Sequence, residues 1–383
     1  MTNQVPHDLG AWLTSTLVPA WAARAFRPGA AGYLEYLTAD GRPDPRPRHT
    51  SLVTARLVYV FSHGHLLDPT GPGLAAAEHG YRFLIERCAD GDGRFRHAVA
   101  ADGTAIDDRS DLYDLAFVLF ACAWYARAIG AREPLDRAQR LMEWIERHMA
   151  APRGGFAEDD RGTLPRRQNP HMHLLEACHA LAETSGDARW LERAGGLADL
   201  LRDRLIDPPT GTLGEFFTAD WQPLAGPAGA LREPGHQLEW VWLLHHHARL
   251  TGDRTVADMA DRLHGFALDH GIARSPEGWP MVLDGVDLHG APVASTRLLW
   301  PQTEAIKAEA ARLEFLNDAG AAARMNAHLA ALFGYWLDAD TGLWVNQLDG
   351  SSRPIAAEVP VRVLYHVMLG LAEADRVRTI TGQ

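Results

Sequence analysis

The stretch DLYDLAFVLFACAWYARAIGAREPLDRAQRLMEWIERHMA, from Asp111 to Ala150, contains the pattern that decides the fold. Its apolar residues recur at spacings of three and four, which predicts two amphipathic helices. Gly130 marks the end of the first helix, and polar residues lead into the second. Upstream, GRFRHAVAADG from Gly93 is typical of a small β-like hairpin with polar turn residues. The stretch therefore predicts a unit of helix, turn, helix and hairpin.

The hairpin segment recurs along the whole chain. Six copies share a glycine, a nearby aromatic residue or leucine, and polar turn residues, and their anchors are Tyr33, Phe95, Phe156, Leu213, Trp279 and Trp344. The steps between anchors are 62, 61, 57, 66 and 65 residues, which indicates a structural repeat. Six such units predict an all-α fold, an (α/α)6 barrel of six helix hairpins with short β-hairpin-like loops at one end. We expect one catalytic domain over residues 1–383; an open α-solenoid is the alternative.

Composition narrows the class of partner. The chain has 383 residues, 46% of them hydrophobic, and a formal net charge of −12, which argues against nucleic acid and anionic membranes as partners. No signal peptide and no apolar run of membrane-spanning length is evident. Cys88, Cys122 and Cys178 lie far apart and are expected to be reduced and buried. We expect a cytoplasmic monomer or homodimer with a small, neutral molecule as its ligand.

Polar residues cluster at one position in the repeat. The helix after each hairpin brings polar or ionisable side chains into an otherwise apolar sequence, and such groups are costly to bury unless they are paired or functional. Their recurrence at the same end of all six inner helices predicts one polar pocket at the mouth of the ring. The side chains are Arg48, Asp111, Tyr113, Asn169, His173, His236, Glu239, Trp300, Glu304 and His366.

Histidines give the pocket its chemistry. His236 precedes Glu239 by three residues, so both are expected on one helix face, where a carboxylate can raise the basicity of an imidazole. The run His245-His246-His247 lies about three turns further along the same helix. Consecutive residues point in different directions around a helix, so we interpret this run as structural rather than as a metal site.

The motifs RHT at Arg48, NPHMHLLEA from Asn169, PGHQLEW from Pro234, LWPQTEAIKA from Leu299 and the late pair Tyr365-His366 occur in one order. Together they resemble the N-acylglucosamine 2-epimerase superfamily, which includes cellobiose 2-epimerases and mannose isomerases, over nearly the whole chain. The resemblance implies an (α/α)6 barrel, and the proton transfer described below needs no metal and no redox cofactor. It implies catalytic roles for His236 and His366, with Glu239 and Glu304 in support. It implies substrate contacts from Arg48, Tyr113, Phe117, Asn169, Met172, His173 and Trp300. One departure is the loop GRPDPRPRHT, which lacks the aromatic residue that isomerase members often carry before the arginine.

This residue set suits proton transfer next to a sugar aldehyde. Imidazole is a base near neutrality, and Arg48 or a protonated histidine could stabilise the charge of a cis-enediol. We favour isomerisation of D-mannose to D-fructose, with D-lyxose and D-xylulose as a second pair. The alternative is 2-epimerisation of mannose and glucose or of a β-1,4-linked disaccharide. Two alternatives from other functional classes remain. One is an inverting glycoside hydrolase that uses a pair of carboxylates from Glu239, Glu304, Asp111 and Asp114. The other is a non-catalytic sugar-binding module.

Overall fold

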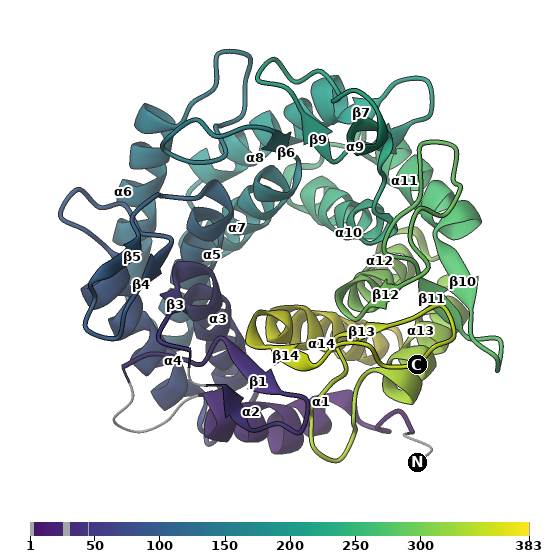
Figure 1. Ribbon diagram of the computed structural model, residues 1–383, viewed down its shortest axis with the longest axis horizontal. Coiled ribbons are helices and arrows are strands. Elements are labelled where there is room, and N and C mark those ends of the chain that lie inside the picture. Colours follow the sequence, from purple (N-terminus) through teal and green to yellow (C-terminus); the bar gives the residue numbers. More distant parts are fainter. Residues whose placement is uncertain (1–3, 26–30, 45, 383) are drawn as a thin grey trace.

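Two concentric rings of helices form the protein (Figure 1). The computed structural model describes residues 4–25, 31–44 and 46–382. The inner helices are α3 (Ser51–Leu67), α5 (Leu112–Ile129), α7 (Asn169–Ser185), α10 (Pro234–Thr251), α12 (Trp300–Leu316) and α14 (Leu364–Thr381). Each packs against the next, and α14 returns to α3, so the ring is closed. The predicted (α/α)6 barrel is confirmed, and the open solenoid is wrong.

The outer ring follows the same order. Its helices are α2 (Val18–Ala25), α4 (Gly73–Phe83), α6 (Glu133–His148), α8 (Arg189–Leu200), α11 (Ala257–His270) and α13 (Ala321–Tyr335). Short segments complete the helical part: α1 (Leu9–Trp12), α9 (Pro227–Ala230), the π-helical turns Leu13–Leu17, Leu84–Cys88 and Leu201–Leu205, and the 3₁₀ turn Val361–Val363.

The two rings differ in how they are buried. Outer helix α6 buries one stripe, which includes Ala138, Leu141 and Ile145, as a surface helix does. Inner helix α5 is buried on nearly all sides. By length and composition, α5 is also the one helix among the described residues that could cross a membrane, which the sequence reading did not anticipate. Of that window, 72% is buried inside the protein, and this position in the inner ring accounts for its apolar character.

Helix ends are set by local chemistry. The side chain of Asp111 accepts a hydrogen bond from the backbone N–H of Tyr113 and so caps the start of α5. Gly130 ends that helix with φ +64°, a left-handed conformation that glycine adopts without strain. The predicted glycine stop is therefore confirmed, and each inner helix begins at the same mouth of the barrel (Figure 1).

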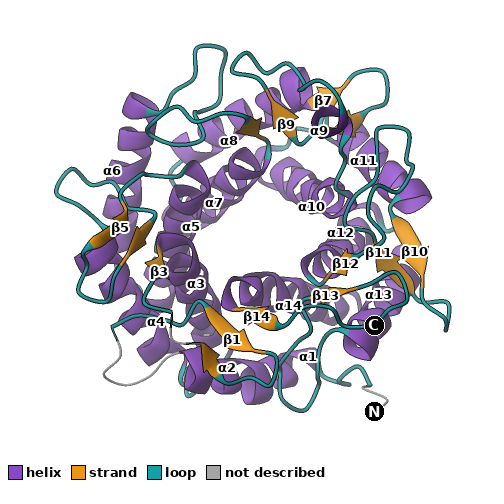
Figure 2. Cartoon of the chain, viewed as in Figure 1, coloured by secondary structure: helices purple, strands orange, loops and turns teal. Residues whose placement is uncertain are grey.

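Short strands form a collar around that mouth, drawn in orange in Figure 2. They are β1 (Tyr36–Thr38), β2 (Pro43–Asp44), β3 (His49–Thr50), β4 (Ala98–Val99), β5 (Ala105–Asp107), β6 (Arg166–Arg167), β7 (Ile206–Asp207), β8 (Thr212–Leu213), β9 (Phe216–Phe217), β10 (Ile272–Arg274), β11 (Pro280–Val282), β12 (Arg297–Leu298), β13 (Gln347–Leu348) and β14 (Glu358–Pro360).

The collar joins one repeat to the next. The strands just before α3, α7 and α12 pair antiparallel with hairpin strands of the following repeat, in the pairs β3–β4, β6–β9 and β12–β13. The strand before α14 pairs with the first repeat, with Tyr36 opposite Pro360, and so closes the collar. These pairings hold the starts of the inner helices in place around the central opening.

Candidate active site

A cavity of about 380 Å³ opens at the collar end of the barrel, a size that suits one sugar unit. Every inner helix contributes to its wall. Seven of the residues expected from the sequence line it: Tyr113, Asn169, His173, His236, Glu239, Trp300 and His366. The predicted polar pocket is therefore present where the repeat pattern indicated.

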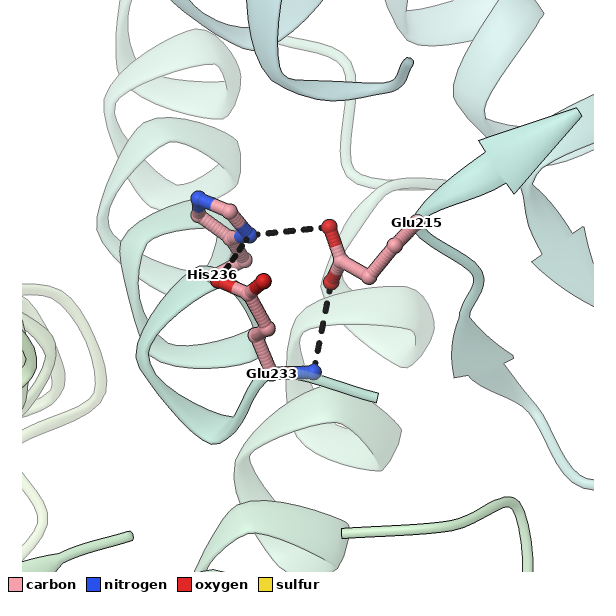
Figure 3. Close-up of side chains that lie close together, drawn as sticks. All are labelled: Glu215, Glu233 and His236. Carbon is pink, nitrogen blue, oxygen red and sulfur yellow. Dashed lines mark hydrogen bonds and ion pairs between the residues drawn. The ribbon is translucent and has the colours of Figure 1, made fainter. Parts of the chain in front are cut away.

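His236 lies between two carboxylates that the sequence reading missed (Figure 3). Its Nδ1 is 2.9 Å from Glu215 Oε2 and 3.2 Å from Glu233 Oε2. Glu215 also accepts the backbone N–H of Glu233, which fixes its orientation. Burial opposes a charge on His236, but Glu215 and Glu233 outweigh it and raise the pKa of His236 to about 10. His236 is therefore an imidazolium at neutral pH, and Nδ1 donates to the carboxylates.

His366 has the opposite character. Burial, together with the cations Arg56 and Lys307, lowers its pKa well below the ordinary value. Its Nδ1 lies 2.7 Å from Glu304 Oε1, and Glu304 is fully buried behind it. When Nδ1 donates to Glu304, the lone pair of Nε2 is free for a ligand, so His366 is suited to be a base.

Trp300 packs against both histidines. Its ring centroid is 4.8 Å from that of His236 and 5.6 Å from that of His366. Asn169 also lines the cavity, and no described residue bonds its buried Oδ1, which leaves an acceptor for a hydroxyl group. The cavity thus combines a flat apolar wall, a cationic acid and a neutral base.

Arg48 does not line the cavity, which corrects the expectation from the sequence. It precedes α3 at the collar, is exposed, and its Nη2 lies 2.8 Å from His97 Nε2. Arg56, inside α3, lines the cavity instead; it is 2% exposed and donates to Tyr113 Oη at 2.6 Å. Its position within the apolar run LVTARLVYVF could have identified Arg56 from the sequence, because a buried charge is costly unless it is paired or functional.

Comparison with known proteins identifies the family of this chain. The sequence profile of N-acylglucosamine 2-epimerase (GlcNAc 2-epimerase) matches residues 32–370. The chain belongs to this family. It is 34% identical to a mannose-6-phosphate isomerase of Rhizobium meliloti over 96% of each chain. It is 31% identical to a D-mannose isomerase of Thermobifida fusca, over 83% of this chain and 82% of the relative. It superposes on a cellobiose 2-epimerase of Spirochaeta thermophila with a TM-score of 0.86 at 24% identity, covering 98% and 96% of the two chains. The protein is thus a sugar isomerase or epimerase.

Three of the remaining expected residues lie behind the cavity wall of this family member. Phe117 is buried beneath Arg56, whose guanidinium is 4.1 Å from the ring centroid, and it packs against His173 at 4.5 Å. Met172 is fully buried in α7 and does not line the cavity. Glu304 reaches the cavity only through His366. None of these three side chains lines the cavity.

Glu239 is not the partner of His236, although the spacing suggested it. Its Oε1 lies 3.6 Å from Lys307 Nζ and 4.0 Å from His173 Nδ1, and both of its buried oxygens lack a hydrogen bond among the described residues. His173 instead pairs with Glu176 at 3.0 Å, and burial lowers the pKa of His173 to about 3. The side chain of Glu239 faces Lys307 and His173, whereas His236 faces Glu215 and Glu233.

Two groups of side chains come close enough to hold a cation: Glu215 with Glu233 and His236, and Glu239 with Glu304 and His366. In the first group, His236 itself is the cation between the carboxylates. In the second, Lys307 Nζ lies 2.6 Å from Glu304 Oε2. Both groups therefore already contain a positive charge from the protein.

The run His245–His247 lies at the far end of α10, as expected. Its three side chains meet three different neighbours: Phe315 faces His245, Glu183 faces His246, and His179 Nε2 lies 3.0 Å from His247 Nδ1. A second cavity of about 520 Å³ lies among the C-terminal halves of the inner helices, and His246 is the member of the run that lines it. The run takes no part in the sugar site.

Replacing Arg56 with methionine is expected to lower kcat/KM about 100-fold, because a fixed cation near developing negative charge is lost. The matched control is Arg48→Ala, for which we expect a change of less than about twofold since surface substitutions have small effects. Steady-state kinetics with mannose measures both. An equal loss in the two variants would contradict this assignment of the arginine.

Proposed function

We propose that this protein interconverts D-mannose and D-fructose, and also D-lyxose and D-xylulose, through a cis-enediol. One observation carries the proposal: a single cavity holds a protonated histidine, His236, and a neutral histidine, His366, and both pack against Trp300. Proton transfer between two carbons of an aldose requires one acid and one base in reach of the same atoms. Both curated relatives compared above are named isomerases, which supports isomerisation over epimerisation.

The steps follow from the two protonation states. After the pyranose ring opens, His366 Nε2 takes the proton from C2, and the electron pair of that bond forms the C1=C2 double bond. His236 gives its Nε2 proton to O1, where negative charge develops near Arg56. His366 then returns the proton to C1, O2 loses its proton to His236, and the C2 carbonyl forms. Both histidines end as they began, so no further reactant is required.

The test is incubation with D-mannose in heavy water, followed by NMR. We expect fructose to form, with deuterium at C1 to the extent that His366 exchanges its proton with solvent. Glucose as the sole product would mean that the proton returns to the opposite face of C2, and the proposal would then be wrong in favour of epimerisation. Release of reducing sugar from a disaccharide, retained in His236→Ala, would indicate a hydrolase.

Phosphorylation of the substrate can be tested at the cavity mouth. Among the cavity arginines, Arg167 is paired with Glu158 at 2.6 Å, and no carboxylate partner of Arg362 occurs in the described part of the chain. We expect the unphosphorylated sugar to be preferred, since Glu215, Glu233 and Glu239 offset most of the positive charge that the arginines and His236 bring to the wall. Arg362→Ala should therefore change KM for mannose by less than about threefold.

A preference for mannose 6-phosphate would give a different result for Arg362→Ala. If mannose 6-phosphate is the better substrate, and Arg362→Ala raises its KM about tenfold or more while sparing mannose, then Arg362 binds the phosphate and the preference for free mannose is wrong. Steady-state kinetics on both sugars with both proteins decides between the two.

A further inference from the structure

Lys307 is the only lysine in the chain. The other 36 of the 37 basic residues are arginines, and most of them lie at the surface or the collar. Lys307 is fully buried in α12, near the centre of the barrel, one turn beyond Glu304. A chain that uses arginine everywhere else has lysine where a compact point charge, rather than a wide planar fork, fits the space.

The surroundings of Lys307 are acidic and aromatic. Nζ lies 2.6 Å from Glu304 Oε2 and 3.6 Å from Glu239 Oε1. The indole of Trp242 faces it at 4.5 Å from Nζ to the ring centroid, which favours a cation further. Two of the three groups that could jointly hold a metal ion, Glu239 and Glu304, are thus bridged by this ammonium.

We propose that Lys307 is a positioning residue that takes the place of a bound cation and holds Glu304 as a carboxylate. Glu304 then accepts the Nδ1 proton of His366, which leaves the Nε2 lone pair on the sugar side. What His366 does with that lone pair rests on the proposed function. The position of the proton does not rest on the proposed function, because it follows from the contacts of Glu304 with Lys307 and His366.

Charge balance requires this cation. Burial and Glu239 raise the pKa of Glu304 well above its ordinary value, and Lys307 opposes them. The 2.6 Å contact between Lys307 Nζ and Glu304 Oε2 is what favours the carboxylate form. Burial disfavours the charge on Lys307, but Glu304 and Glu239 outweigh it and raise the pKa of Lys307. The amine therefore stays protonated, holds no free electron pair, and does not form an imine with the sugar aldehyde. The charged and titratable groups that face the pair from the packed helices are Arg56 of α3, His173 and Glu176 of α7, Glu239 of α10, and Tyr365 and His366 of α14.

Loss of the ammonium has a defined consequence. Without it, Glu304 takes up a proton at a higher pH and becomes a donor toward His366 Nδ1. The imidazole then carries its own proton on Nε2, so it offers the sugar a donor and no base. Lys307→Met, which keeps the length of the side chain, should lower kcat between about tenfold and 100-fold, the coupling typical of one hydrogen-bonded network. The acid limb of the pH profile should move to higher pH.

A double-mutant cycle tests whether Lys307 acts through Glu304. We compare kcat and its pH profile for Lys307→Met, Glu304→Gln and the double variant, with Arg324→Met as the matched control. Arg324 is the cation beside Glu309, another buried carboxylate on α12, at 2.8 Å, but outside the cavity. We expect the double variant to be no slower than Glu304→Gln alone, and Arg324→Met to keep the wild-type pH profile. Losses that multiply would overturn the proposal, since Lys307 would then act independently of Glu304.

A second measurement needs no activity. Labelling lysine alone with ¹⁵N gives a single side-chain signal, from Lys307. We expect an ammonium signal up to at least about pH 10, near the ordinary lysine value, that moves in Glu304→Gln and not in Arg324→Met. A neutral amine at about pH 8, or a signal unaffected by Glu304→Gln, would overturn the proposal. This measurement uses wild type and Glu304→Gln, so it stands if Lys307→Met does not fold. If wild type makes glucose instead of fructose, the proposed function fails and the NMR result still decides the role of Lys307.

Discussion

Replacing His366 with glutamine is expected to lower kcat for mannose isomerisation about 1,000-fold, within the range for loss of a general base. Glutamine keeps a polar side chain beside Glu304 but offers no nitrogen lone pair to the C2 proton. Exchange of the C2 proton with heavy water should fall by the same factor, because the same step is blocked. NMR of mannose in heavy water measures both quantities in one sample.

The chain offers a matched control for that variant. His264 is also buried, and its Nε2 lies 2.8 Å from Glu309 Oε1, so it repeats the His–Glu pair of the site at a place outside the cavity. His264→Gln should lose some stability and keep kcat within about twofold. If His366→Gln keeps a tenth of the wild-type rate, or if His264→Gln is as slow, His366 is not the base.

Replacing His236 with glutamine should also lower kcat about 1,000-fold at neutral pH, because the acid that protonates O1 is lost. The pH dependence separates the two histidines. His236 has a pKa raised to about 10, so its acid form persists through neutrality and the alkaline limb of kcat should lie near that value. Removing one carboxylate by Glu215→Gln lowers the pKa of His236, and the alkaline limb should then move to lower pH.

The same shift predicts a change in stability. A histidine whose pKa is raised on folding binds its proton more tightly in the folded state. The His236–carboxylate pairs therefore contribute their full stabilisation below about pH 6.5, the ordinary value, and lose it as the pH rises toward about 10. Chemical denaturation between these limits should show a steeper loss for wild type than for Glu215→Gln. An identical slope in both proteins would mean that Glu215 does not hold the proton of His236.

Several features of the site were accessible from the sequence because they depend on local spacing. The hairpin period placed the starts of six inner helices at one end, and seven expected side chains line the cavity there. His236 and His366 are each the third residue of an inner helix, so their position in the repeat directs them to the mouth. The wrong expectation, Arg48, precedes its helix by three residues and remains on the collar, while Arg56 lies more than one turn inside.

The sequence did not show which carboxylate pairs with which histidine. The spacing of His236 and Glu239 suggested a pair within one helix, but His236 turns to Glu215 on the preceding hairpin and to Glu233 at the helix start. Glu304 and His366 are 62 residues apart, and only the packing of α12 against α14 brings them within 2.7 Å. Lys307 went unnoticed as well, although a single lysine in the chain was a signal that composition could have supplied.

The amino-acid sequence by itself determined the helix pairs, their number, the hairpins between them and the end of the barrel where polar side chains gather. These follow from periodicity and from glycine and capping residues, which act over a few positions along the chain. The tertiary structure alone decided which carboxylate meets which histidine, and hence that His236 is a cation and His366 is neutral. Those protonation states depend on burial and on charges from other helices, and these are distances across the ring that no spacing along the chain encodes.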